Sequence, residues 1–299
     1  MSARSKMLVL GLLSITPTKL WCASADEWKL ADPTVLAGKQ ITSLVSLKRE
    51  PAAASTDGSS GRVVVGGPSE QTVSRMLLVK KSTSTSLVLE QTVKRVQMTI
   101  ESPLGKSVYD SDNAFERDQI TSGLSQRYDP YINKVHKSDY TTTPAQPKQP
   151  TSDEGFESVW TLNLPTLIGV PSLQGMFISR LPLSATVGAG WVDTIRSEKG
   201  TTVNKYQVLN AQGDLLKLKL ASELLPGAQP RVVASSKGNS PVTSTIKTLT
   251  YTGEVNIRRA TGFIEELHLT KNSSASINAA GKTLQNTSVA IVELHNTLK

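Results

Sequence analysis

The chain has 299 residues, of which 19% are charged and 5% are aromatic, and its formal net charge is +8. The low share of charged residues and the abundance of serine and threonine favour strands and loops over long helices. Lysine and arginine are dispersed among serine and threonine instead of clustered with aromatic residues, so the sequence lacks the usual pattern of a nucleic-acid-binding surface. The length suffices for one large domain or two medium ones.

The first 25 residues have the pattern of a secretory signal peptide. Arg4 and Lys6 precede a short apolar run, and small residues at 23–25 stand just before Asp26. The run is too short to cross a bilayer as a helix. We therefore predict export to the periplasm or cell envelope, with cleavage after Ala25. Cleavage there removes three basic residues and no acid, which lowers the net charge from +8 to +5.

Cys22, the only cysteine, lies within this segment. The mature chain is therefore expected to contain no disulfide. Cys22 follows Trp21, whereas a lipid-modified cysteine normally follows a small residue, so a cleaved signal peptide is favoured over a lipid anchor. No later stretch approaches about 18 consecutive apolar residues, and the mature chain is predicted to have no transmembrane span.

Two β-rich blocks are predicted, at residues 26–139 and 155–299, joined by a linker at 140–154 that is rich in proline and threonine. In the first block, a strand at 28–30 and a strand at 41–47 are expected to pair around a turn at 37–39. The segment from 50 to 69 has the composition of a flexible loop, with a short edge strand at 62–65.

The clearest strand pattern of the first block is Val93–Ile100. There Val96, Met98 and Ile100 alternate with polar residues, which places them on one face of a strand. Segments 76–79 and 86–90 are predicted strands before it. A turn at 102–106 leads into a hairpin partner at 107–110, and a short helix is expected within 112–125.

The second block begins with a predicted strand at 156–164 and a connection rich in proline and glycine. Leu216, Leu218 and Leu220 alternate with Lys217 and Lys219, so one face of that strand is expected to be buried and the other wet. Polar loops are expected at 226–241 and 272–282. The remaining strands of this block are predicted at 201–209, 215–223, 245–257, 264 onward and 288–295.

These patterns predict a mainly β fold, either one strongly curved antiparallel sheet or two β-blocks, with a few short helices. An α+β half-barrel similar to the lipoprotein carriers is the alternative. Several segments of the chain also resemble a family of uncharacterised exported β-rich bacterial proteins, often lipoproteins, known only as a domain of unknown function. The segments that carry the resemblance are Lys94–Met98, Tyr109–Ser111, Leu181–Pro182, Val187–Trp191, Gly253–Glu254 and Thr261–Ile264.

The resemblance implies an exported protein of the cell envelope with no assigned activity, and the family supplies no catalytic or ligand-binding residues. The chain departs from the family pattern in two places. Gly190 is a second glycine before the tryptophan, and Cys22 is not part of a lipid-attachment motif.

No residues with catalytic or metal-binding spacing stand out. His136, His268 and His295 are far apart in the sequence, and no Gly-x-Ser-x-Gly motif occurs. The run Asp110–Asn113 has alternating oxygen donors but lacks the glycine and distal glutamate of a calcium loop, so a turn is the better interpretation. We predict no catalytic residue, no metal and no cofactor.

Aromatic residues are the remaining candidates for a site. Trp160, Trp191, Tyr206 and Phe263 are predicted to line a concave ligand-binding surface if the sheet curls, with ordinary core packing as the alternative. The hypothesis is a non-enzymatic exported envelope protein that binds an apolar or amphiphilic ligand. The alternative is a structural or partner-binding surface protein that uses its sheet edges and loops, with another envelope protein as its partner.

Overall fold

The computed structural model describes residues 28–30, 33–56, 62–82, 86–102, 105–113, 124–141, 151–152, 180–182, 185–197, 200–226, 231–234, 242–279 and 282–299. Over these ranges the helical segments are short: η2 (Pro33–Leu36), α2 (Leu124–Tyr128) and η3 (Asp129–Tyr131). The strands, in chain order, are β1 (Trp28–Leu30), β2 (Gln40–Arg49), β3 (Ala52–Thr56), β4 (Arg62–Gly66), β5 (Ser69–Ser82), β6 (Ser86–Ser102), β7 (Gly105–Asp110), β8 (Val135–Thr141), β9 (Thr151–Ser152), β10 (Arg180–Pro182), β11 (Gly190–Ser197), β12 (Gly200–Gln212), β13 (Leu215–Pro226), β14 (Arg231–Ala234), β15 (Val242–Arg258), β16 (Ile264–Ala279) and β17 (Lys282–Leu298).

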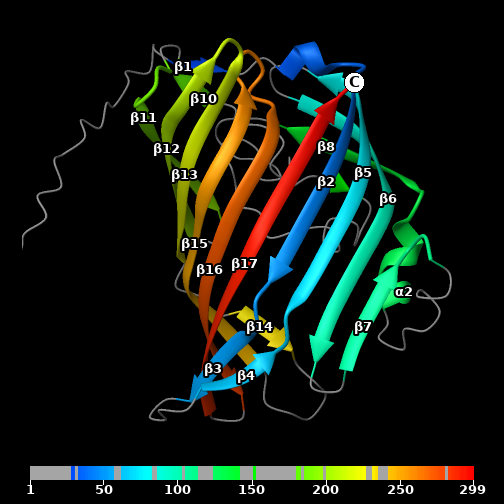
Figure 1. Cartoon of the computed structure of the whole chain (residues 1–299), viewed down its shortest axis with the longest axis vertical. Coiled ribbons are helices and arrows are strands. Elements are labelled where there is room, and N and C mark those ends of the chain that lie inside the picture. The colour runs from blue at the N-terminus through cyan, green and yellow to red at the C-terminus, as the bar shows by residue number, and fades with distance from the viewer. Residues whose placement is uncertain are drawn as a thin grey trace, which may run out of the picture.

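Fifteen of these strands form one sheet (Figure 1). Eleven of them follow the neighbour order β11-β12-β13-β15-β16-β17-β2-β5-β6-β8-β9, and the other four lie off this path: β14 pairs with β15, β3 with β17, β4 with β3 and β7 with β6. The last strand, β17, pairs with β16 on one side and with β2 on the other. Apart from β1 and β10, which pair with each other in a separate two-stranded sheet, the described strands of both predicted blocks therefore belong to a single antiparallel sheet. The prediction of a mainly β protein with one curved antiparallel sheet is confirmed.

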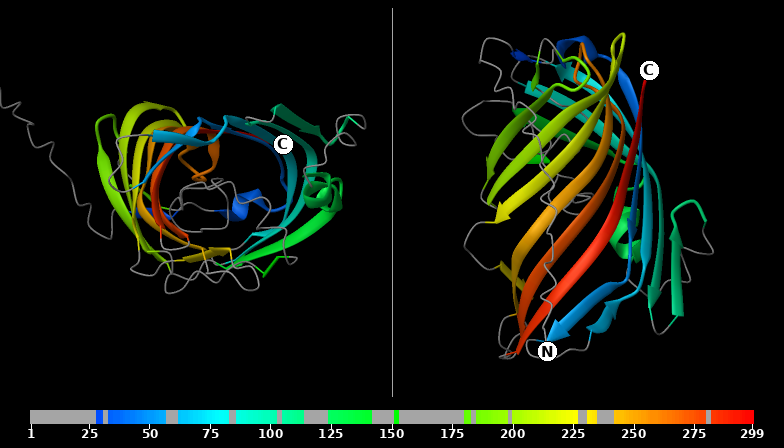
Figure 2. Two further views of the ribbon diagram at one scale, coloured as in Figure 1. Left: turned by 90° about the horizontal axis from the view of Figure 1, so that it is seen from below. Right: turned by 60° about the vertical axis from the view of Figure 1, so that its left-hand side comes forward.

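The sheet bends so strongly that it follows most of a ring when seen from below (Figure 2). Register shifts interrupt the pairing of β12 with β13, of β15 with β16 and of β5 with β6. Such bulges bend a strand and increase its local twist. Gly253, in the middle of β15, allows β15 to approach β16 closely, because a Cβ built there would lie 2.0 Å from the carbonyl oxygen of His268 on β16.

The position of η2 identifies the concave face of the sheet. This short helix lies inside the ring (Figure 2), and its Leu36 packs against Ile41 of β2, Leu77 of β5 and Leu89 of β6. Because side chains alternate between the faces of a strand, Val45 on β2 also points to the concave side. The largest apolar cluster, which contains Val45, therefore covers the concave face from β11 to β2.

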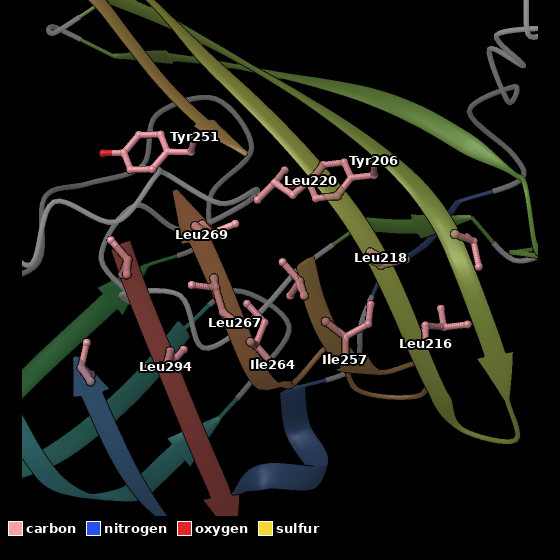
Figure 3. Packing of buried hydrophobic residues seen from close by; sticks show 14 of the residues in the cluster. Tyr206, Leu216, Leu218, Leu220, Tyr251, Ile257, Ile264, Leu267, Leu269 and Leu294 are labelled. Carbon is pink, nitrogen blue, oxygen red and sulfur yellow. The ribbon is translucent and has the colours of Figure 1, made fainter. Parts of the chain in front are cut away.

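Three apolar clusters occupy the side of the sheet that carries these residues. The largest spans β11, β12, β13, β15, β16, β17 and β2, and Figure 3 shows many of its leucines and isoleucines gathered on one face. A second surrounds η2. In the third, Leu124 and Tyr128 of α2 pack against Val73 of β5 and Val96 of β6. Full burial of one such aliphatic side chain contributes about 1.5–3 kcal/mol, so these clusters are the main source of stability.

The predicted alternation of β13 is confirmed. Leu216, Leu218 and Leu220 are fully buried, whereas Lys217 and Lys219 lie on the convex face. The hairpin that precedes them closes through Gly213, whose φ of 58° is the left-handed conformation that glycine adopts without strain. The predicted strands in 93–100, 107–110, 201–209 and 245–257 are likewise present.

Two predictions for the start of the chain are wrong. The strand at 28–30 does not pair with the strand at 41–47. It is β1, and its partner is β10, while β2 pairs with β17 and β5. The segment 50–69 is not a loop throughout, because β3 and β4 form a hairpin there and β3 extends the sheet along β17. Backbone pairing with β17 compensates for the small side chains of Ala52–Thr56.

The predicted polar loop at 272–282 is also wrong. Strand β16 continues to Ala279 and pairs with both β15 and β17 along this length. Hydroxyl groups bond across the strands, with 2.7 Å between the Oγ atoms of Ser273 and Ser288 and 2.7 Å between Thr248 Oγ1 and Ser274 Oγ. A polar segment between two hydrogen-bonding neighbours is stable as a strand without its own apolar pattern.

Several other predictions fall on residues that the structure does not describe. These are the signal peptide at 1–25, most of the linker at 140–154, the strand at 156–164 and the first part of the helix predicted within 112–125. The last residues of that helix prediction are present as the start of α2 at Leu124. In the described ranges, no helix has the length and apolar character needed to cross a membrane.

Candidate functional site

The concave apolar surface is the strongest candidate for a site. We use this name for three cross-strand rows of buried side chains, which consist of Leu216, Ile257 and Ile264; Val208, Leu218, Val255, Leu267, Leu294 and Val45; and Leu220, Leu269, Val292 and Leu47. The third row includes Gly253 between Leu220 and Leu269. Side chains from six strands thus form a continuous apolar floor (Figure 3).

Two of the four predicted aromatic residues border this surface together. Trp191 of β11 and Tyr206 of β12 are direct cross-strand partners, and their rings stack with centroids 4.9 Å apart and planes at 13°. Both side chains are 3% exposed. A turn precedes Trp191, with Gly188 at a φ of 87° and the Ala189 amide donating to the Thr186 carbonyl.

The other two predicted aromatic residues do not join them. Phe263 is fully buried in the separate cluster around η2, where it packs with Leu36 and Leu89. Trp160 lies outside the described residues. The structure therefore groups Trp191 with Tyr206 and places Phe263 at another end of the sheet.

A row of polar residues borders the concave apolar surface on the side opposite Leu216. Cross-strand pairing places its members next to one another in the order Asp193, Asn204, Ser222, Tyr251, Lys271, Ala290 and Arg49. We call this the polar row. It runs directly beside the row of Leu220, Leu269 and Val292, so the concave face has an apolar area and a polar border. Figure 3 shows Tyr251 at the margin of the apolar side chains.

Lys271 and Tyr251 are the two groups of the polar row whose pKa values are strongly shifted. Burial lowers the pKa of Lys271 to about 8, and the positive charge of Arg49 contributes in the same direction. Its Nζ lies 6.0 Å from the ring centre of Tyr251. Burial raises the pKa of Tyr251, which keeps the phenol neutral at physiological pH. No carboxylate of the described residues forms an ion pair with Lys271 or with Arg49.

The convex face of the same strands is lined by charged residues. Lys217 pairs with Glu254 at 2.7 Å, and two histidines pair with glutamates of neighbouring strands: His268 with Glu293 at 3.0 Å and His295 with Glu266 at 3.4 Å. These residues surround a shallow depression of about 290 Å³. Their side chains are 42–60% exposed, so each pair contributes little to stability.

Sequence reasoning missed the proximity of these two histidines. It comes from the β16–β17 hairpin, whose register pairs Glu266 with His295 and His268 with Glu293. The spacing of alternate polar residues on both strands was the available signal. Even so, the described residues contain no group of three histidines, cysteines or acids placed to hold a metal ion.

The predicted turn at 110–113 is a structural junction on β7. Asp110 accepts hydrogen bonds from Arg95 Nε at 3.0 Å, from Arg95 Nη2, from Gln97 Nε2 at 3.0 Å and from the Asp112 amide at 3.1 Å. The hydrogen bonds from Arg95 are the main reason that the pKa of Asp110 is lowered, against the opposing effect of burial. The carboxylate therefore holds β6, β7 and the turn together.

Comparisons with known proteins give no family. No protein-family model and no curated protein matches the chain. Among solved structures, it is similar to an outer membrane channel from Pseudomonas putida F1, with a TM-score of 0.23, 10% identity and coverage of 92% of this chain and 99% of that chain. The toluene transporter TodX of P. putida gives a TM-score of 0.21, 8% identity and coverage of 90% and 92%. TM-scores this low establish neither a shared fold nor a shared function.

Proposed function

We propose that the protein is a non-enzymatic binding protein of the cell envelope, which holds an apolar or amphiphilic ligand against the concave face of its sheet. One observation supports the proposal: the apolar side chains of six neighbouring strands face into the curve, while charged pairs lie on the convex face. The apolar side chains are at most 5% exposed, so a bound ligand has to replace protein atoms that cover them. Binding sites for small molecules are typically concave and mostly apolar, with a few polar groups that orient the ligand.

The location in the envelope is part of the proposal. It is supported by the basic, apolar and small-residue pattern of residues 1–25 and by the resemblance to exported bacterial proteins. The charged pairs around Glu254 and Glu293 support a convex face in contact with water.

Calorimetric titration with monodecanoylglycerol tests the binding function, because this amphiphile has a tail but no charge. The variant Val292→Thr places a hydroxyl on the concave apolar surface with almost no change in volume, which costs about 1–3 kcal/mol where the hydroxyl has no partner. We expect saturable binding by the wild type and weaker binding by Val292→Thr. The matched control is Val192→Thr, because Val192 is 38% exposed on the convex side of β11. Equal affinities of both variants, or no binding by the wild type, would refute the proposal.

A second candidate function is partner binding through the sheet edge. β11 is the last strand on one side of the sheet in the described part of the chain, and Val192 and Thr194 are exposed along it. An edge strand of eight residues can accept a strand from another protein. Cross-linking from a cysteine introduced at Thr194 tests this function. A captured envelope protein with a defined contact supports it, and a strictly monomeric, uncross-linked chain contradicts it.

A further inference from the structure

Strand β17 lies between the two halves of the sheet. It follows every other described strand in the chain, yet in the neighbour order it is placed between β16 and β2. It pairs with β16 on one side, and on the other its residues Ala290–Leu298 pair with Ile41–Arg49 of β2. Figure 1 shows β17, in red, beside the blue β2. Strands from opposite ends of the described chain are thus direct neighbours.

The backbone of β17 and the residue after it hold β2 at both ends. At one end Gln40 and Lys299 exchange two hydrogen bonds, with N···O distances of 3.2 Å and 2.8 Å. At the other end the Glu50 amide donates to the Val289 carbonyl at 3.0 Å. The chain then continues into β3, which pairs with residues 284–287 of β17. One strand therefore supplies a hydrogen-bonding edge for both β2 and β3.

Apolar side chains of β2 are buried by residues from the second half of the chain. Val45 and Leu47 are 0% and 4% exposed, and every other buried member of their cluster lies between Ala185 and Leu294 in the sequence. Leu294 and Val292 of β17 are the direct cross-strand partners of Val45 and Leu47. Pairing with β17 therefore places these two side chains in a core that the later strands build.

The cluster around η2 is shared between the two halves in the same way. Phe263, which precedes β16, is fully buried in it together with Leu36 of η2 and Ile41 of β2. Leu298 of β17 packs against the same cluster. Strand β5 follows β2 closely in the chain and also pairs with it, but that pairing covers one edge of β2 and leaves both shared clusters incomplete.

The third cluster differs, because its members are close together in the sequence. Val73, Val96, Tyr109 and Leu124 all lie within residues 73–128, on β5, β6, β7 and α2. Contacts at short sequence separation form readily, whereas pairing between distant strands must first overcome the entropy of closing a long loop. The local cluster and the two shared clusters therefore differ in when they can become ordered.

We propose that β17 is the docking strand of the first half of the sheet: β2 and β3 become ordered only when residues 282–299 are in place, although they are synthesised first. Chains commonly fold from the N-terminus during synthesis, and in this sheet the early strands wait for the strand that follows all others. This order suits the export predicted from residues 1–25, because the sheet does not close before β17 has been synthesised. The inference is independent of ligand binding.

Pulsed thiol labelling during refolding of the full chain tests this order. Three buried valines are replaced singly by cysteine in a Cys22→Ser background, which leaves one thiol in each protein. They are Val45 on β2, Val292 on β17 and Val96 on β6, and all are at most 1% exposed. We expect Val45→Cys to become protected at the rate of Val292→Cys and not before it. Val96→Cys reports on the local cluster.

A substitution in β17 gives a second readout. Leu294→Ala removes contacts between β17 and β2, and it should slow the protection of Val45→Cys and Val292→Cys by the same factor. That factor is about fivefold or more for contacts that are half formed in the transition state. The rate of Val96→Cys should not change. Leu124→Ala, in the local cluster, is the matched control and should slow Val96→Cys instead.

Two results would overturn the inference. Protection of Val45→Cys before Val292→Cys would show that β2 becomes ordered without β17. Slower protection of Val292→Cys in the Leu294→Ala protein, with an unchanged rate for Val45→Cys, would show the same. If Leu294→Ala does not refold, the order of protection in the three single-cysteine proteins still decides.

Discussion

Replacement of Lys271 by methionine should make the ligand-free protein more stable. The pKa of this lysine is lowered from 10.5 to about 8, mainly by burial, which corresponds to at most ~3 kcal/mol of destabilisation by its charge at neutral pH. Methionine has a similar length, removes the charge beside Arg49 and forfeits only the cation–π contact with Tyr251, worth about 0.5–1 kcal/mol. The expected net gain in the free energy of unfolding at pH 7 is about 2 kcal/mol.

The pH dependence of this gain follows from proton linkage. Between pH 8 and 10.5 the unfolded chain binds more protons at Lys271 than the folded chain does, because the folded pKa is the lower one. The stability of the wild type relative to Lys271→Met therefore rises with pH through this window. The advantage of the variant should be complete below pH 8 and should fade towards pH 10.5.

Urea unfolding of both proteins between pH 7 and pH 10, followed by circular dichroism, measures this difference. Other titrating groups cancel, because only the difference between the variants is compared. Lys205→Met, an exposed substitution on the convex face, should stay within about 0.5 kcal/mol of the wild type. A Lys271→Met protein that is less stable than wild type at pH 7, or a gain that does not change with pH, would show that the charge of Lys271 is already compensated in the fold.

Three further substitutions test the account of the fold by chemical denaturation. Trp191→Ala should cost about 3–5 kcal/mol, since the indole is buried and stacked on Tyr206; a loss below about 1 kcal/mol would contradict core packing. Gly253→Ala should cost about 3 kcal/mol or more, because the added Cβ meets the His268 carbonyl at 2.0 Å; an unchanged midpoint would show that β15 and β16 can separate. Asp110→Asn should cost about 1–2 kcal/mol at pH 7. Because the folded pKa of Asp110 lies below 3.8, this difference should shrink only as the pH falls below about 4, and a pH-independent difference would argue against the charged hydrogen bonds.

The strands with a strict apolar and polar alternation could be predicted from the sequence. Leu216, Leu218 and Leu220 identify a half-buried strand by themselves, because a period of two has no other simple explanation. Strand pairing could not be predicted in the same way. Trp28 begins a strand whose partner lies about 150 residues later, and nothing in its own neighbourhood specifies β10 over β2. Tertiary contacts alone make that choice.

Strands made of polar residues could not be predicted from the sequence either. Asn272–Ala279 has the composition of a loop, and it is a strand because β15 and β17 supply hydrogen bonds on both sides. The same limit applies to the candidate site. The alternation of Leu267 and Leu269 already places Lys271 on the buried face, but only the cross-strand register shows that Arg49 lies on the same face two strands away.

The central claim is that the concave apolar surface holds a ligand, and native mass spectrometry tests it most directly. The chain is purified without detergent from the envelope fraction of cells that produce it, then measured before and after extraction with organic solvent. We expect a reproducible excess mass that the solvent releases, and the released compound should be apolar or amphiphilic. A chain of bare mass that also takes up neither decanoate nor monodecanoylglycerol would contradict the claim.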